Sequence, residues 1–495
     1  MKMKFELLIN IIFSIIKALC MLWVISKSSG IFTYSFLGIF LLSRRFSSTI
    51  SNFLQLGMAQ TIRRYVSMNL ENNSRKDYVF FGFLIWIIIS ICTLPIVLFY
   101  DDALAELMFG EKQYESLGLL TWMVTLSLIL HYLANSTLFS ERKVFLSNIF
   151  DLMNSSGFVL IALYIEKLNN SPETVLHFQV IGIISICFIY LLSYFSTDFS
   201  LTLFIKNKQF SRLFNTFVKY GSYRGLITFF DSLVILIGPW LLRDNLVASG
   251  NLVIAYTFLR LIQTAINPIS QIISVGVARN LNNKDIDSHI SKAVRNIVGI
   301  VIYLSVIALC FLIPWRDEIL YLWLRDYSIV NGVSFYYNAI LLALVPISIF
   351  HGLKGIIEMK WFKPYNLYTL IVTIIIQVLS FLILTNFVGD IAINLSIIIS
   401  FFIAGLMTLF YLKDYLPKVK YYSLGKLLLA SSILLLVNYT LLILNINIMI
   451  SFVVYFVSII IVFKFFSSLF ITEIYTMLKI DKNIKNILKK SFKLN

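Results

Sequence analysis

Two adjacent arginines lie near the middle of a hydrophobic stretch that is long enough to cross a bilayer. The stretch runs from Ile31 to about Gly57 (IFTYSFLGIFLLSRRFSSTISNFLQLG), with Arg44 and Arg45 near its centre. At about 1.5 Å per residue, a helix of this length spans the hydrocarbon core. A guanidinium at the bilayer centre costs about 2.5–3.5 kcal/mol, so both must face protein or a water-filled cavity. Guanidinium groups match phosphate oxygens well, so the pair points to recognition of an anion.

Polar side chains at helical spacing recur on four predicted spans, and we expect each stripe to face inward because a polar stripe facing lipid is costly. The stripes are Asn10, Ser14 and Lys17 on the first span, Arg45, Ser48, Asn52 and Gln55 on the second, Arg224, Thr228 and Asp231 on the seventh, and Tyr256, Arg260, Gln263, Asn267, Gln271 and Ser274 on the eighth.

These stripes predict a shared central cavity with an excess of positive charge, which favours an anionic guest. The predicted substrate-binding residues are Lys17, Arg44, Arg45, Asn52, Arg260, Gln263 and Asn267. Arg45 shares the stripe of its span and is the better candidate for contact with substrate. Arg44 lies about 100° around the helix, which favours an ion pair with an acid such as Asp231. The alternative is that these residues are buried contacts between helices, for example Asp231 paired with Arg44 or Arg260.

The composition is that of a polytopic membrane protein. Of the 495 residues, 59% are hydrophobic and 13% are charged, whereas soluble domains have about 25% charged residues. The net charge of +16 follows the positive-inside rule, because about 31 lysines and arginines fall in alternate loops on one side and about 6 on the other. We therefore expect both termini in the cytoplasm and no nucleic acid as a partner.

The apolar runs predict an all-α fold with about fourteen transmembrane helices. A weak repeat places YSFL (34–37) and GMAQ (57–60) around the second span, and YTFL (256–259) and GVAR (276–279) around the eighth. We interpret this as two six-helix bundles with a site between them near the midplane. The predicted domains are residues 1–205, residues 206–424, and residues 425–495, the last being a helix pair with a basic cytoplasmic tail.

No residue pattern for catalysis, metal binding or ATP hydrolysis stands out, so we predict no enzyme activity, no catalytic residue, no metal and no cofactor. Transport would then draw on a proton or sodium gradient or on substrate turnover. Asp231 is the candidate for ion coupling. His131 is a second candidate for carrying protons, although a lone histidine in a span is more often a packed, hydrogen-bonded residue.

The sequence resembles the polysaccharide transporters of the multidrug/oligosaccharidyl-lipid/polysaccharide exporter superfamily, and within them the Wzx-type flippases of O-antigen or capsule repeat units. The resemblance extends over nearly the whole chain. It rests on about fourteen spans with both ends inside, on the six-plus-six repeat, on QLGMAQTIRRYVS (55–67) and on IAYTFLRLIQTAINPISQ (254–271).

This resemblance implies two six-helix lobes that form a V around a cationic cavity in the bacterial inner membrane. It implies alternating access, with an undecaprenyl-diphosphate-linked oligosaccharide as substrate and membrane lipids around it. A polysaccharide polymerase and a chain-length regulator are the implied protein partners. Three alternatives stay open: a lipid II flippase, a drug or metabolite exporter of the same fold, and a membrane O-antigen polymerase or ligase. The last normally needs a large outside loop, whereas the longest one here, near residues 315–334, is short.

Overall fold

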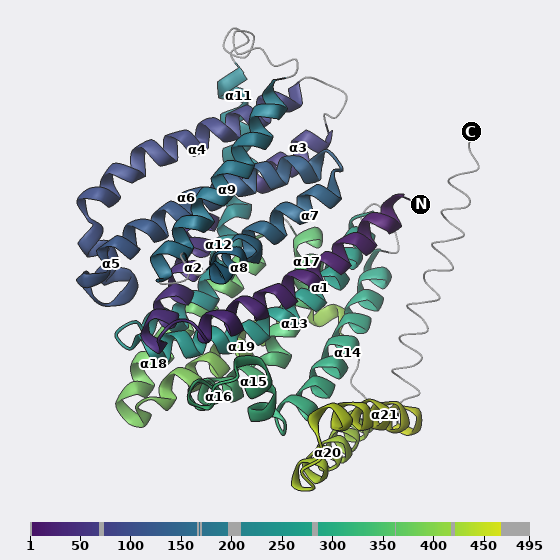
Figure 1. Cartoon of the computed structure of the whole chain (residues 1–495). Helices are drawn as coiled ribbons and strands as arrows, with labels where there is room; N and C mark the ends of the chain where they lie inside the picture. Colours follow the sequence, from purple (N-terminus) through teal and green to yellow (C-terminus); the bar gives the residue numbers. More distant parts are fainter. Residues whose placement is uncertain are drawn as a thin grey trace. The chain divides into compact units, whose positions relative to one another are not determined.

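The structure is a computed structural model that describes residues 2–68, 74–165, 168, 171–196, 209–279, 286–361, 363–416 and 421–466 (Figure 1). Helices make up nearly all of these residues, and no strand occurs among them. The predicted all-α fold is confirmed. The basic tail after residue 466 and the loops 197–208 and 280–285 lie outside the described residues, so the charge bias there stays a sequence prediction.

Apolar helices of spanning length account for the predicted membrane class. Among the described residues, nine helices are long and apolar enough to cross a membrane, and the bent pair α16 (Tyr327–Leu342) and α17 (Leu344–Lys360) adds a tenth. Three shorter apolar helices, Leu246–Leu261, Leu428–Ile443 and Ile448–Ile459, lie in α13, α20 and α21. With α2 (Tyr34–Leu54), whose polar residues lower its hydropathy, these elements account for the predicted fourteen.

The chain divides into two compact units, residues 1–258 with 323–336 and residues 259–322 with 337–495. The three domains predicted from the sequence are a different division and stay a prediction. The first unit holds the following helices: α1 (Lys2–Ser29), α2, α3 (Met58–Met68), α4 (Ser74–Phe99), α5 (Asp101–Phe109), α6 (Glu115–Ser140), α7 (Val144–Leu152), α8 (Phe158–Tyr164), α9 (Pro172–Phe195), α11 (Gln209–Thr216), α12 (Ser222–Leu241) and the first part of α13 (Leu246–Arg279).

The core of the first unit forms where α3, α4, α6 and α9 pack together (Figure 1). Met58, Ile62, Phe81, Leu130 and Cys187 are among its fully or nearly fully buried side chains. Since α3 follows α2 after a three-residue turn, this core fixes the direction in which α2 ends. Two π-helical turns interrupt the unit's helices, η2 (Met153–Gly157) between α7 and α8 and η3 (Phe217–Gly221) before α12.

Glycines bring backbones into direct contact at both ends of α2. At its start, a Cβ on Gly38 would lie 2.1 Å from the carbonyl oxygen of Leu246 in α13. At its end, a Cβ on Gly57 would lie 1.9 Å from the carbonyl oxygen of Gly221, and one on Gly225 would lie 2.5 Å from the Gly57 nitrogen. Such small-residue contacts are typical of membrane helices, which gain stability from close packing. They fix α2, and with it Arg44 and Arg45, against α12 and α13.

The second unit is built on α14 (Ile286–Leu312), α17, α18 (Tyr365–Val388) and α19 (Ile391–Tyr411), together with most of α15 (Arg316–Leu324) and the second part of α13. One core cluster joins α13, α14 and α17 through residues such as Ile266, Ile297 and Leu353. The last two helices, α20 (Tyr421–Ile443) and α21 (Ile448–Phe466), pack on α14 through a second cluster that contains Cys310 and Tyr455.

Candidate functional site

The side chain of Arg45 is an unpaired cation inside the first unit. Only 7% of its surface is exposed. In the part of the chain that the structure describes, it has no hydrogen-bond or ion-pair partner. A guanidinium that is largely withdrawn from water without a counter-ion is unfavourable, although the nitrogens of Arg45 are not fully buried. The position of Arg45 is therefore one where an anionic ligand would relieve a cost already present in the protein.

Arg44, the neighbouring residue, is held by the protein itself. Its guanidinium donates a hydrogen bond to the backbone carbonyl of Ser155 and lies over the ring of Phe40, with 5.7 Å between Cζ and the ring centroid. Ser155 is in the π-helical turn η2, where the altered helical repeat disturbs the regular backbone bonding. We predicted an ion pair between Arg44 and an acid such as Asp231. Among the described residues, Arg44 is bonded to a backbone carbonyl instead.

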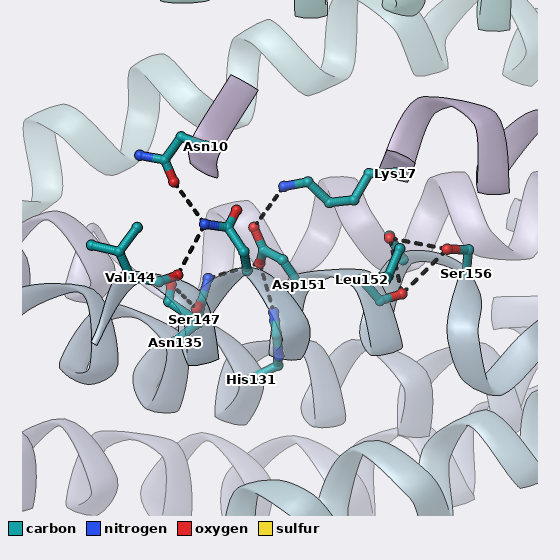
Figure 2. A network of polar contacts seen from close by, with 11 residues as sticks. Asn10, Lys17, His131, Asn135, Val144, Ser147, Asp151, Leu152 and Ser156 are labelled. Carbon is teal, nitrogen blue, oxygen red and sulfur yellow. Dashed lines mark hydrogen bonds and ion pairs between the residues drawn. The ribbon is translucent and has the colours of Figure 1, made fainter. Parts of the chain in front are cut away.

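Lys17 forms an ion pair with Asp151, which joins α1 to α7. Lys17 Nζ donates to Asp151 Oδ2 over 3.0 Å, and the two side chains keep 24% and 36% of their surfaces exposed. One turn earlier on α7, Asn148 Nδ2 donates to Asn10 Oδ1 over 2.7 Å. The predicted polar face of the first span, which carries Asn10 and Lys17, thus lies against α7 (Figure 2). Lys17 would have to leave Asp151 before it could bind a substrate.

Asp151 is the centre of a polar network that sequence reasoning did not assemble. Its Oδ1 lies 3.2 Å from Nε2 of His131 and accepts a hydrogen bond of 2.7 Å from Asn135 Nδ2, both from α6 (Figure 2). Because a carboxylate only accepts, Nε2 of the fully buried His131 carries the proton. Ser147 extends the network by donating to Asn135. The signal in the sequence that could have found it is one acid, Asp151, and one histidine, His131, in neighbouring, mostly apolar spans.

Two further predicted site residues are engaged between helices. Asn52 Nδ2 donates to Ser232 Oγ in α12 over 2.7 Å, and its own Oδ1 accepts from Gln55 over 3.0 Å. In the second unit, Gln263 Nε2 lies 2.8 Å from His351 Nε2 in α17. These are the contacts expected if the polar residues join helices to one another rather than bind a substrate. Binding of substrate by Asn52 and Gln263 stays a prediction that requires these hydrogen bonds to be exchanged.

The remaining predicted site residues lie on α12 and α13. Asp231 and Arg260 are half-buried, and each has interaction partners of its own. Asn267 is on α13, and its side chain lies outside the described part of the structure. Three carboxylates with suitable spacing for a cation, those of Asp101, Asp102 and Glu115, meet where α5 and α6 begin, but two of these residues are exposed and acidic clusters of this kind are common without an ion.

The Lys17–Asp151 pair gives a prediction about stability. Changing Asp151→Asn leaves the Lys17 ammonium half-buried and without its counter-ion, and should destabilise the protein by roughly 1–2 kcal/mol, since partial exposure reduces the penalty of a fully buried charge. The double variant Lys17→Met with Asp151→Asn should recover part of this loss. Both effects are measured by thermal unfolding of the purified protein, in which the labelling of the buried thiols Cys187 and Cys310 reports the unfolded fraction.

The exposed pair Lys112–Glu106 is the matched control for this cycle. Its atoms are 3.7 Å apart and its side chains are 66% and 57% exposed, so Glu106→Gln should have almost no effect on unfolding. Equal destabilisation by Asp151→Asn and Glu106→Gln would show that the Lys17–Asp151 pair does not hold α1 to α7.

Solved structures of similar fold are membrane transporters. The lipid II flippase MurJ in an inward closed conformation is 14% identical, with a TM-score of 0.74 over 94% of this chain and 100% of that one. A MOP superfamily transporter from Pyrococcus furiosus is 13% identical, with a TM-score of 0.58 over 83% of this chain and 94% of that one. An inward-facing MATE multidrug transporter is 12% identical, with a TM-score of 0.58 over 82% and 97%. No family model and no curated protein sequence matches.

The chain has a MurJ-like and MATE-like transporter fold. The multi-pass membrane class predicted from composition is confirmed by this fold and by the candidate spans. The fold is shared by a flippase for a lipid-linked substrate and by multidrug exporters.

Proposed function

We propose that this protein is a flippase that moves an undecaprenyl-diphosphate-linked oligosaccharide, the repeat unit of an O-antigen or capsule, across the bacterial inner membrane by alternating access. The observation that carries the proposal is Arg45, a buried guanidinium with no protein counter-ion among the described residues. A diphosphate supplies oxygens that a guanidinium binds in pairs. The fold supports the proposal as well, because the solved structures that share it include inward-facing and outward-facing conformations.

The proposed binding group is the set of basic and amide residues Lys17, Arg44, Arg45, Asn52, Arg260, Gln263 and Asn267. Arg45 would contact the diphosphate directly. Arg44, fixed by Ser155 and Phe40, would contribute charge from the same helix. Asp231, or Asp151 with its bound Lys17, would offer a carboxylate for coupling to a proton or sodium gradient. Both termini would lie in the cytoplasm, and a polymerase and a chain-length regulator would act on the exported unit.

A second candidate is a lipid II-type substrate, because the fold of the lipid II flippase MurJ covers 94% of this chain. Both candidates share the lipid diphosphate and differ in the sugar. A drug exporter is the weaker candidate, since a cationic guest would meet the uncompensated charge of Arg45 with repulsion rather than attraction.

Deletion of the gene tests the function. We expect loss of a surface glycan and accumulation of its complete lipid-linked repeat unit on the cytoplasmic leaflet, measured by glycan electrophoresis and mass spectrometry of extracted lipids. Accumulation of lipid II, with arrest of cell-wall synthesis, would identify the second candidate instead. Normal surface glycan and normal lipid II, together with altered drug sensitivity, would contradict both.

A further inference from the structure

Two arginines from separate helices of the first unit lie against one tyrosine ring. Arg64 is in α3 and Arg224 is in α12, and the Cζ atom of each is 4.5 Å from the ring centroid of Tyr220 in the π-helical turn η3. Both arginines are exposed. The sequence places Arg64 in one basic segment, IRRYVSMNLENNSRKDY (62–78), and Tyr220 and Arg224 in another, FIKNKQFSRLFNTFVKYGSYR (204–224). The positive-inside rule predicts that both segments are cytoplasmic.

The tyrosine is positioned by packing that extends into the core. Tyr65 contacts Tyr220 edge-on, with 5.7 Å between ring centroids, and stacks on the buried Tyr78 of α4 at 5.3 Å. The contact of Gly57 with Gly221 brings the turn before α3 directly onto η3. The apolar helix around Tyr220, residues 210–241, has 32 residues, about a dozen more than a bilayer requires. The helix is therefore long enough for its first turns to reach beyond the hydrocarbon core.

The ring orients the two guanidinium groups without neutralising them. A cation over a tyrosine face gains about 0.5–1 kcal/mol at an exposed site, which offsets some of the repulsion between the two charges. In the described residues, no carboxylate lies within ion-pair distance of either guanidinium. A guanidinium carries five N–H donors, so each arginine keeps donors beyond those that contact Tyr220, and these can bind an oxyanion.

We propose that Arg64, Arg224 and Tyr220 form a binding site for a phosphate or diphosphate group at the predicted cytoplasmic end of the first unit. An anion bound by both guanidinium groups bridges α3 and α12 and removes the repulsion between the two arginines. The ligand is the head group of an anionic membrane lipid or the diphosphate of a lipid-linked molecule, since both present the same oxygens at this depth. The site is separate from Arg45 and does not depend on the proposed flippase activity.

Binding of soluble pyrophosphate to the full-length protein in phosphatidylcholine nanodiscs tests the site. Arginine footprinting with phenylglyoxal, analysed by mass spectrometry, reads each arginine separately and so distinguishes this site from Arg45. We expect pyrophosphate to slow the modification of Arg64 and Arg224 together, with one apparent affinity. Arg63 is the internal control, because it is the adjacent exposed arginine and lies over Phe139, 5.4 Å from the ring centroid. Equal protection of Arg63, or protection of none of the three, would overturn the proposal.

Variants provide an independent measurement. The double change Arg64→Gln with Arg224→Gln should weaken the binding of pyrophosphate at this site by about 10- to 100-fold, the loss expected for one or two charge-assisted hydrogen bonds. Arg63→Gln removes one charge from the same helix and should change the affinity less than about twofold. A similar loss in both would show that only the net charge of the surface attracts the anion.

Nanodiscs that contain phosphatidylglycerol separate the two sources of the ligand. If the site binds a lipid head group, increasing phosphatidylglycerol should compete with pyrophosphate for protection of Arg64 and Arg224. If it binds a diphosphate, pyrophosphate should protect both arginines equally well in the presence and absence of phosphatidylglycerol.

Discussion

Replacing Arg45 with methionine should strongly reduce export of the lipid-linked glycan, while the protein remains as stable as the wild type or becomes more stable. Methionine fills a similar volume without a charge, so the variant loses the charge-assisted contacts to a diphosphate. The transport rate should fall about 10- to 100-fold. It also removes a buried guanidinium that has no counter-ion among the described residues. Export is measured by surface glycan in a deletion strain that carries the variant, and stability by thermal unfolding of the purified protein.

Arg45→Lys separates charge from geometry. Full activity of the lysine variant would show that charge alone is needed, whereas partial activity indicates paired contacts to two oxygens. Arg44→Met is the matched control on the same helix. Since Arg44 is bonded to Ser155, its loss should lower the unfolding temperature. An Arg45→Met protein that is inactive because it unfolds as readily as Arg44→Met would contradict a ligand-binding role for Arg45.

Gly57→Ala should lower the unfolding temperature sharply and reduce the yield of folded protein. Gly57 has φ of +72°, a backbone conformation that costs an L residue about 1–2 kcal/mol. The new Cβ would also lie 1.9 Å from the carbonyl oxygen of Gly221, so η3 and the start of α12 must move away from the end of α2. The same displacement would separate Tyr220 from Arg64. Thermal unfolding and the footprinting of Arg64 and Arg224 measure the two consequences.

Gly389→Ala is the control for the backbone effect. Gly389 also has a positive φ, +57°, but a Cβ there would meet nothing within 4 Å. With ψ of −130°, its backbone is also strongly disfavoured for an L residue. Its substitution carries a conformational penalty without the collision and should have the smaller effect. Equal destabilisation by the two substitutions would show that the contact between Gly57 and Gly221 contributes nothing beyond the backbone angle.

The all-helical membrane fold could be predicted from the sequence because each span is recognised from its own run of apolar residues. Spans such as those of α4 and α9 are continuous apolar runs, and their length is set by the thickness of the bilayer rather than by any partner. The repeat around GMAQ and GVAR predicted two six-helix bundles, which stay a prediction. The repeat did not reveal that the backbone of Gly57 contacts that of Gly221. Gly221 is 164 positions away in the sequence and belongs to no motif that would link it to Gly57.

The candidate site was accessible only in part. Helical spacing correctly placed Asn10 and Lys17 on one face, and that face packs on α7 through Asn148 and Asp151. Spacing could not tell which residue would meet each polar group. Spacing favoured an acid as the partner of Arg44, whereas in the structure Arg44 donates to the backbone carbonyl of Ser155. A backbone partner cannot be predicted from the pattern of side chains.

The sequence by itself determined that charges are present inside the membrane and that the basic ones are in excess, since type and position along a span are properties of the chain alone. The tertiary structure decided which charges are compensated. Lys17 is compensated by Asp151, 134 residues away, whereas Arg45 has no partner among the described residues. The physical reason is that the free energy of a buried charge depends on the groups within a few ångströms of it, and only the packing of helices brings these groups together.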